Sequence, residues 1–344
     1  MNASRDVTIY DLAKALKLSP ATVSRGLKNH PAVKKVTRVR ILDMAKVMGY
    51  QRNQFARNLR VRHTNTIGVI VPRLDSYVMS AIISGMEKVA QARGYSLLIS
   101  QSQESAEKEQ SNVRTMFNSR VDGLLLSLSS NTEDLSHLDA FFQKRIPVIL
   151  FDRVVRHPLS TSISIDNVRA GYDVTRHLIE QGCSRIVHIG GSIKRDVYSD
   201  RLEGYRAALQ ESGMIIDNSL VFHNELKEDD GINVARAILE LDPMPDGIFA
   251  SNDTTAAACI KILKENGLSI PGDIAVAGFN EDPVSRVIEP QLTTIHYPGL
   301  DMGELAARTM IDAIRGQHSA SLNNLILRHQ LVVRNSTLRH SNQN

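Results

Sequence analysis

The second half of the chain carries polar side chains at positions where apolar segments end. Asp152 directly follows Val148–Phe151, and Asn280 comes shortly after Ile274–Ala277. Carboxylates, amides and a planar guanidinium form directional hydrogen bonds, and their convergence at one place would suit a ligand with adjacent hydroxyls. Taken singly, each of these residues could equally cap a helix or support a turn. The candidate polar set is Asp152, Arg201, Asn252, Asp253 and Asn280.

A second group of residues that could bind a partner lies near the N-terminus, where the charge is strongly positive. Residues 1–63 hold 14 Lys and Arg against 3 Asp and no Glu, whereas residues 64–344 hold 27 basic and 34 acidic residues. A solvated surface is the ordinary explanation of a charge run. So large an excess in residues 1–63 nevertheless indicates a polyanionic partner, and we expect nucleic acid.

Capping residues and apolar spacing predict that these basic residues lie on short helices. Thr8 can cap a first helix, whose apolar residues recur at three- and four-residue spacing and which ends near Lys17. Ser19 can cap a second helix with Pro20 at its first position. Two short helices this close predict a helix-turn-helix. A third helix ending at Gly49 completes a small core through an apolar stripe of Val39, Ile41, Leu42, Ala45 and Met48.

The second helix has one face that could read base edges. Val23 and Leu27 share the face toward the first helix. An outward arginine on such a helix can donate two hydrogen bonds to guanine in a major groove. The alternative is a generic three-helix bundle that binds protein, with Arg25 as a surface charge. The outward residues are Pro20, Ala21, Ser24 and Arg25.

From Thr66 onward, short apolar segments alternate with helix-like stretches. This alternation predicts parallel sheets covered by helices on both faces, and two such blocks in series predict two Rossmann-like subdomains. Ligands bind outside the carboxyl ends of parallel strands, so a cleft between the subdomains is the natural small-molecule site. We expect strands at 67–71, 96–100, 123–128 and 148–151 in a first set and at 162–165, 185–189, 247–250 and 274–277 in a second, with helices that include Asn167–Gln181 and Thr254–Asn266.

The sequence resembles the lactose-repressor (LacI) family of transcriptional regulators over essentially its whole length. The headpiece motif runs from Thr8 to Arg25. Lys34 departs from the family, which usually has a serine there that caps the third helix, so this helix could begin later, near Thr37. The further matching segments are 49–60, 66–72, 151–153, 201–205, 250–253, 292–295 and 331–336.

The resemblance implies a DNA-binding surface. Pro20, Ala21 and Arg25 would read bases, and other headpiece residues would hold phosphates. Residues 53–60 would form a hinge that folds only on binding, because eight residues are too few for a stable isolated helix. Leu59 would wedge into the central base step and kink the duplex; a flexible basic linker is the alternative for this segment. The full set is Thr8, Tyr10, Ser19, Pro20, Ala21, Thr22, Ser24, Arg25, Asn29, Asn53, Ala56, Arg57, Leu59 and Arg60.

The resemblance also implies an effector pocket. Asp152, Arg201 and Asn252 would contact a small molecule, and apolar side chains would form the walls. The residue pairs 280–281 and 297–298 depart from the family's frequent pattern, which leaves the effector's identity open. The mixture of carboxylate, amide and arginine groups favours a sugar or sugar phosphate. The full set is Leu74, Tyr77, Asp152, Arg201, Asn252, Asp253, Phe279, Asn280 and Tyr297.

These patterns predict an α/β protein of three parts. Residues 1–49 form the helix-turn-helix headpiece, 50–63 the hinge, and 64–344 the effector-binding and dimerisation module. We expect one subdomain at about 64–163 plus 294–322 and the other at about 164–292 plus 323–344. The module resembles periplasmic binding proteins. Expected partners are a double-stranded, pseudo-palindromic DNA operator, a small effector and a second copy in a homodimer.

Other classes of protein fit less well. An exported sugar-binding protein would share the α/β part but not the basic headpiece. A nucleotide-dependent enzyme is disfavoured because the G-x-G-x-x-G spacing and a Walker sequence are missing. We therefore expect no catalytic residue, metal or cofactor. Cys183 and Cys259 fit buried small residues. The apolar runs are too short to span a bilayer, and the N-terminus lacks a secretion core, so we expect a cytoplasmic, nucleoid-associated protein.

Overall fold

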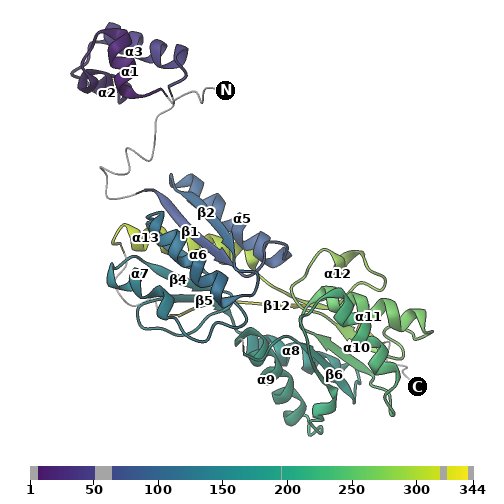
Figure 1. Cartoon of the computed structure of the whole chain (residues 1–344). Coiled ribbons are helices and arrows are strands. Elements are labelled where there is room, and N and C mark those ends of the chain that lie inside the picture. Colours follow the sequence, from purple (N-terminus) through teal and green to yellow (C-terminus); the bar gives the residue numbers. More distant parts are fainter. Residues whose placement is uncertain (1–6, 51–63, 195, 318–323, 340–344) are drawn as a thin grey trace. The chain divides into compact units, whose positions relative to one another are not determined.

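The expected α/β architecture is present (Figure 1). A computed structural model describes residues 7–50, 64–194, 196–317 and 324–339. The chain divides into two compact units: residues up to 64, which contain the predicted headpiece, and residues from 65 onward, which form the module.

The headpiece is a three-helix unit whose first two helices start at capped residues. They are α1 (Ile9–Leu16) and α2 (Pro20–Leu27), followed by α3 (Lys35–Val47). Thr8 and Asp11 form a reciprocal capping box, in which the Asp11 carboxylate accepts from the Thr8 amide at 2.8 Å. Ser19 Oγ accepts from the Thr22 amide at 3.1 Å. Both starts therefore lie where the sequence predicts them. The buried core is Leu12, Ala13, Leu16, Val23, Val33, Ile41 and Ala45.

The predicted apolar stripe of α3 is partly wrong. Val39 and Leu42 are 49% and 48% exposed, whereas Ile41 is fully buried against α2 beside Gly26. With apolar residues at so many positions of this helix, spacing alone does not decide which face packs. The alternative start of α3 near Thr37 is also wrong, because the helix begins at Lys35 even though Lys34 provides no side-chain cap.

The module contains two parallel sheets. In the first, the strand order is β11-β5-β4-β3-β1-β2, and every neighbouring pair is parallel. In the second, the order is β7-β6-β8-β9, again parallel throughout. The strands of the first sheet are β1 (Thr66–Val71), β2 (Ser96–Gln101), β3 (Gly123–Leu126), β4 (Val148–Phe151), β5 (Thr161–Ile165) and β11 (Asn324–Leu327). Those of the second are β6 (Ile186–Gly190), β7 (Val221–His223), β8 (Gly247–Ala250) and β9 (Ala275–Ala277).

Two strand assignments differ from the prediction. The strand predicted at 162–165 was grouped with the second set, yet β5 pairs with β4 in the first sheet. Residues 323–344 were expected in the second subdomain, but β11 pairs with β5 and so extends the first sheet. Two further strands, β10 (Thr294–His296) and β12 (Gln330–Val332), pair antiparallel with each other. Strand partners are chosen by contacts between distant segments, which the local pattern does not reveal.

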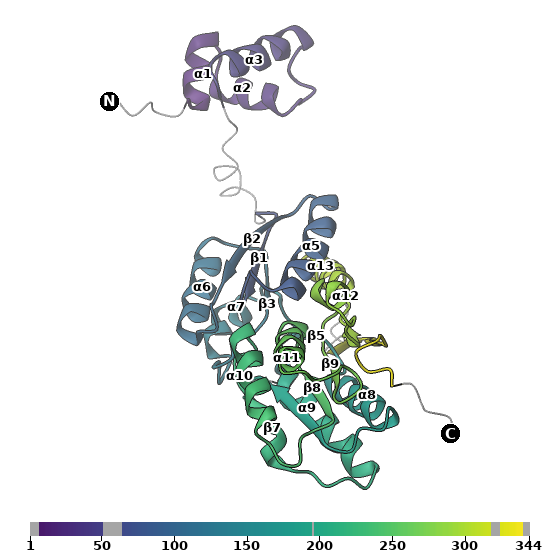
Figure 2. The same cartoon turned by 90° about the vertical axis from the view of Figure 1, so that its right-hand side faces the viewer.

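Helices cover both faces of each sheet, as expected for parallel strands. On the first sheet, Ile67 and Val69 of β1 belong to the core shared with α5 and α13, whereas Ile70 packs with α6 and α7 (Figure 2). On the second sheet, α8 and α9 lie against one face and α10 and α11 against the other. The helices of the module are α5 (Tyr77–Ala92), α6 (Ala106–Asn118), α7 (Asp139–Gln143), α8 (Asn167–Glu180), α9 (Asp196–Glu211), α10 (Glu228–Leu239), α11 (Asp253–Glu265), α12 (Val284–Val287) and α13 (Gly299–Ile314).

The pair α8 and α9 packs backbone against backbone, which fixes the helix that carries Arg201. A Cβ on Gly204 would lie 2.0 Å from the Val168 carbonyl oxygen. We therefore expect Gly204→Ala to lower the free energy of unfolding by about 1–3 kcal/mol, because the helices must separate to admit the methyl group. Urea unfolding measures this, with exposed Glu203→Ala on the same helix as the control. Equal stability of the two variants would contradict the close packing.

No helix in the part of the chain that the structure describes is long and apolar enough to cross a membrane.

Candidate nucleic-acid interface and ligand cleft

The outward face of α2 is available for contact. Pro20, Ala21 and Arg25 are exposed, while Val23 is fully buried, so the predicted orientation of the helix is confirmed. Ser24 is half-buried. Because Ser19 caps the helix and Pro20 begins it, the side chains at its start are held on a rigid turn. The arrangement can present an arginine and small apolar groups to a groove.

The predicted phosphate contacts have different local partners. Tyr10 is well exposed on α1. Ser19 and Thr22 share a hydrogen bond at 2.8 Å between their hydroxyls. Asn29 is exposed in a left-handed conformation, and its side-chain oxygen accepts from Arg38. The Thr8 hydroxyl donates to Asp11 at 2.6 Å, so this side chain also serves the helix cap.

The predicted hinge residues Asn53, Ala56, Arg57, Leu59 and Arg60 lie outside the described residues.

Asp152 stands at the carboxyl end of β4, as predicted. It is buried in a left-handed conformation, and its amide donates to the Ile163 carbonyl at 2.9 Å. Its Oδ1 accepts from the Tyr297 hydroxyl at 2.7 Å. Burial, reinforced by Asp152, holds the pKa of Tyr297 well above its ordinary value, so that hydroxyl remains a donor. The structure thus brings two predicted effector residues into direct contact.

Arg201 is buried on α9 and is fixed from several sides. Its Nε donates to Asn167 Oδ1 at 3.0 Å, and its Nη1 donates to the Ser251 carbonyl at 2.9 Å. The guanidinium carbon lies 3.5 Å from the ring centroid of Phe279, which is a close cation–π contact. Burial lowers the pKa of Arg201 from its ordinary value. A guanidinium held so firmly is preorganised for a ligand that needs a planar donor.

Asn252 and Asp253 make contacts that belong to the fold. Asn252 caps α11, since its Oδ1 accepts from the Thr255 amide at 2.9 Å and its Nδ2 donates to the Leu226 carbonyl at 2.7 Å. Asp253 is completely buried and accepts from Thr294 Oγ1 at 2.7 Å. Burial raises the pKa of Asp253 well above its ordinary value. Asn252 therefore has the capping role that the sequence left open, whereas Asp253 joins α11 to other segments through Thr294 and the Asp282 amide.

The remaining predicted effector residues differ in exposure. Leu74 and Tyr77 are 44% and 50% exposed, whereas Phe279 is fully buried beneath Arg201. Asn280 is half-buried with φ 111°, a left-handed conformation that strains a residue other than glycine. Strain of this kind concentrates at functional sites, where the surrounding structure maintains it.

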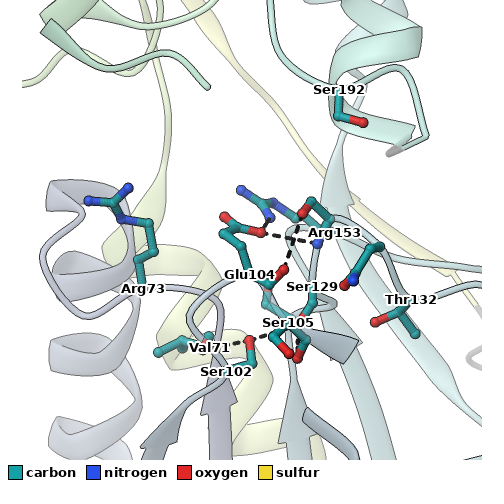
Figure 3. A network of polar contacts seen from close by, with 12 residues as sticks. Val71, Arg73, Ser102, Glu104, Ser105, Ser129, Thr132, Arg153 and Ser192 are labelled. Carbon is teal, nitrogen blue, oxygen red and sulfur yellow. Dashed lines mark hydrogen bonds and ion pairs between the residues drawn. The ribbon is translucent and has the colours of Figure 1, made fainter. Parts of the chain in front are cut away.

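Two polar residues near Asp152 were missed by the sequence prediction. Arg153 donates to Glu104 Oε2 at 2.7 Å, and in Figure 3 the Glu104 side chain points toward it. The same carboxylate oxygen accepts from the Ser130 amide at 3.0 Å, so Glu104 joins the loops after β2, β3 and β4. Burial alone lowers the pKa of Arg153, but Tyr198 and Glu104 outweigh it and raise the pKa. The segment 151–153 was a recognised motif, yet nothing local gave Arg153 a partner.

A separate cavity of about 590 Å³ lies at the amino end of β6. Arg185, Tyr205, Met214 and Asp217 line it, and none of the predicted effector residues does. Ligands of parallel sheets bind at the carboxyl ends of the strands, so the polar groups around Asp152 and Arg201 remain the stronger candidate.

Two segments of the chain match known families. Residues 8–53 match the family described as "Bacterial regulatory proteins, lacI family", and residues 175–337 match the "Periplasmic binding protein-like domain". Catabolite control protein A of Priestia megaterium is 30% identical over 333 residues, which cover 96% of this chain and 99% of the relative. The HTH-type transcriptional repressor CytR of Escherichia coli (strain K12) is 30% identical over 331 residues, covering 96% of both chains.

Solved structures show the same fold. A lac repressor dimer bound to operator and the anti-inducer ONPF superposes with a TM-score of 0.86 at 23% identity, covering 97% of this chain and 100% of the other. A complex of the transcriptional regulator CelR with cellobiose has a TM-score of 0.72 at 26% identity, covering 96% and 99%.

Proposed function

The chain belongs to the lacI family of bacterial regulatory proteins, which are DNA-binding transcriptional regulators, and we propose that it is a ligand-responsive repressor. It binds a pseudo-palindromic operator as a homodimer and carries a sugar or sugar phosphate in the cleft between its two subdomains. It acts through conformational change and not through covalent chemistry, with no cofactor. Because its target is chromosomal DNA, its place is the cytoplasm, at the nucleoid.

The outward face of α2 carries this proposal. Arg25 is exposed on a firmly capped helix within the strongly basic segment of residues 1–63. An arginine so placed reads guanine, and Pro20 and Ala21 admit the close approach of the groove. The residues proposed to hold phosphates are Thr8, Tyr10, Ser19, Thr22, Ser24 and Asn29, and those proposed for the hinge are Asn53, Ala56, Arg57, Leu59 and Arg60.

The proposed effector site is supported by the polar groups at the strand ends. Asp152, Tyr297 and Arg201 provide acceptors and donors, and Phe279 supports the guanidinium from below. A carbohydrate effector is also supported by the similar structure of CelR, which contains cellobiose. The full proposed set is Leu74, Tyr77, Asp152, Arg201, Asn252, Asp253, Phe279, Asn280 and Tyr297, with Asn252 and Asp253 acting mainly by shaping the pocket.

Selection of bound duplexes from a random pool, with and without added sugars, tests the function. We expect enrichment of a pseudo-palindrome with an easily kinked centre, and a change in enrichment when the effector is present. Recovery of no sequence preference, together with saturable sugar binding, would favour the alternative of a non-regulatory sugar-binding protein. An asymmetric half-site bound as tightly as the full site would contradict the dimeric arrangement.

Arg25→Ala should relax discrimination at one base pair per half-site. The loss of a bidentate contact costs about 1–3 kcal/mol for the preferred sequence, while mismatched sequences lose little. Arg60→Ala in the proposed hinge is the comparison, because loss of a basic side chain attracted to the DNA backbone should weaken binding to all sequences alike. Binding titrations with operators varied at each position measure both. Equal weakening of every sequence by Arg25→Ala would show that Arg25 contacts phosphate.

A further inference from the structure

Contacts across the proposed cleft join the loop after β4 to the first turn of α9. The Val154 amide, on the side of the first sheet, donates to Asp196 Oδ2 at 3.1 Å. Beside it, Arg153 Nη2 donates to the Tyr198 hydroxyl at 3.3 Å, and the guanidinium lies 5.6 Å from the Tyr198 ring centroid. We call these four residues the cleft bridge. Because β4 and α9 belong to different subdomains, the bridge must break if the cleft opens widely.

Within the bridge, Asp196 has a buried side-chain oxygen, Oδ1, that lacks a hydrogen-bond partner among the described residues. Arg153, in contrast, is neutralised by Glu104 at 2.7 Å. A carboxylate with one oxygen satisfied and the other enclosed is poorly solvated, and protonation of the enclosed oxygen removes the unfavourable charge.

The carboxylates around Asp196 also favour its protonated form. Asp152 faces it from the end of β4, and Asp200 lies one turn later on its own helix. Burial raises the pKa of Asp196 to about 6, and both neighbouring carboxylates add to this, while the Val154 and Val197 amides oppose it. Arg153 is the cation of the cleft bridge, and it is paired with Glu104.

We propose that Asp196 and Val154 form a proton-controlled latch that holds the two subdomains closed when Asp196 is protonated and loosens when it ionises. The neutral acid keeps its carbonyl oxygen as an acceptor for the Val154 amide, whereas ionisation places a second negative charge beside Asp152. The latch would regulate the cleft in which we place the effector, so this inference rests on the proposed function. It gives the effector response a dependence on pH.

The direction follows from linkage. The closed cleft raises the pKa of Asp196 above its ordinary 3.8, so the closed state binds the proton more tightly than an open state that exposes this carboxyl. Closure is therefore favoured at low pH and is lost as the pH rises through about 6. If opening returns Asp196 to water, the closed-to-open ratio changes by up to roughly a hundredfold between pH 3.8 and about 6.

Fluorescence energy transfer in the full-length protein tests the latch without DNA or effector. Dyes are attached at Ser111→Cys on α6 and Asp229→Cys on α10, both exposed positions in different subdomains. The native Cys183 and Cys259 are buried, which protects them from labelling. Mixing with excess unlabelled protein leaves one labelled chain per dimer. Transfer is recorded between about pH 3.5 and 8, a range that brackets the interval between the open-state and closed-state pKa of Asp196.

The wild-type transfer should change mainly between pH 3.8 and about 6, the open-state and closed-state pKa of Asp196. Asp196→Asn, which keeps an acceptor but cannot titrate, should hold the acidic value throughout, and Asp196→Ala should hold the alkaline value. Glu203→Gln, which removes an exposed carboxylate of the same helix, should titrate like the wild type. A wild type without a transition, or an Asp196→Asn variant that still shows it, would overturn the latch. Because neither DNA nor ligand is present, such a failure leaves the operator selection as a separate test of the proposed function.

Discussion

Operator affinity should fall by a factor of roughly 10³ or more between about 50 and 200 mM salt. The expectation follows from residues 1–63, where 14 basic residues stand against 3 acidic ones. If about six or more phosphates are neutralised, their condensed counterions are released on binding, and added salt opposes that release. Equilibrium binding at a series of salt concentrations gives the slope of log affinity against log salt.

The module supplies an internal contrast for this experiment. Residues 64–344 carry 27 basic against 34 acidic residues, so their field opposes DNA and cannot produce the attraction. Arg60→Ala should reduce the magnitude of the slope of log affinity against log salt by about one. A substitution of the buried Val23 should leave this slope unchanged. A slope near zero for the wild type would contradict the charge argument, whatever sequence the protein prefers.

The headpiece could be predicted well because its signals are local. Thr8 with Asp11 and Ser19 with Pro20 specify two helix starts within a few residues, and both are found. The third helix lacks such a signal, since Lys34 gives no side-chain cap. Its apolar residues also point to more than one face, and the packing of Ile41 beneath Gly26 decides between them. The errors therefore occur in the third helix, where no local signal marks the start and tertiary packing determines which face is buried.

The module shows the same division at a larger scale. Most strands were predicted because each is a short apolar run, but β5 pairs with β11, which lies far away in the chain, and joins its neighbour β4 in the first sheet. No period or cap in residues 161–165 reveals which sheet they join. The fold class was therefore predictable, whereas the distribution of strands between the two sheets was not.

The candidate site was predictable in its residues and not in its connections. Asp152 and Arg201 follow from strand-end position and from family motifs. The Tyr297 hydroxyl on Asp152 and the Phe279 ring beneath Arg201 require the folded chain. Asp196 was missed because a carboxylate at a helix start has an ordinary explanation as a favourable charge for the helix dipole. Its enclosed Oδ1 and its bond to Val154 become visible only with both subdomains in place.

Asp152→Ala and Arg201→Ala should each abolish the effector response while leaving operator binding largely intact. An effector changes DNA affinity only through its unequal affinity for two arrangements of the subunits. Removal of a polar anchor in the pocket removes that inequality, and the equilibrium that exists without ligand stays nearly where it was. Operator affinity measured with and without saturating effector should therefore differ several-fold or more in the wild type and by less than about twofold in each variant.

Stability must be separated from recognition in these variants, because both residues serve buried partners. Arg201→Ala leaves the Ser251 carbonyl and Asn167 without a donor, at a cost of about 1–3 kcal/mol each. Asp152→Asn retains shape and an acceptor for Tyr297, so it tests the charge with less disturbance. Calorimetric titration of each folded variant against sugars, sugar phosphates and purines then locates the pocket. Wild-type ligand affinity in both Ala variants would show that the effector binds elsewhere, and saturable binding of a purine alone would reject the carbohydrate.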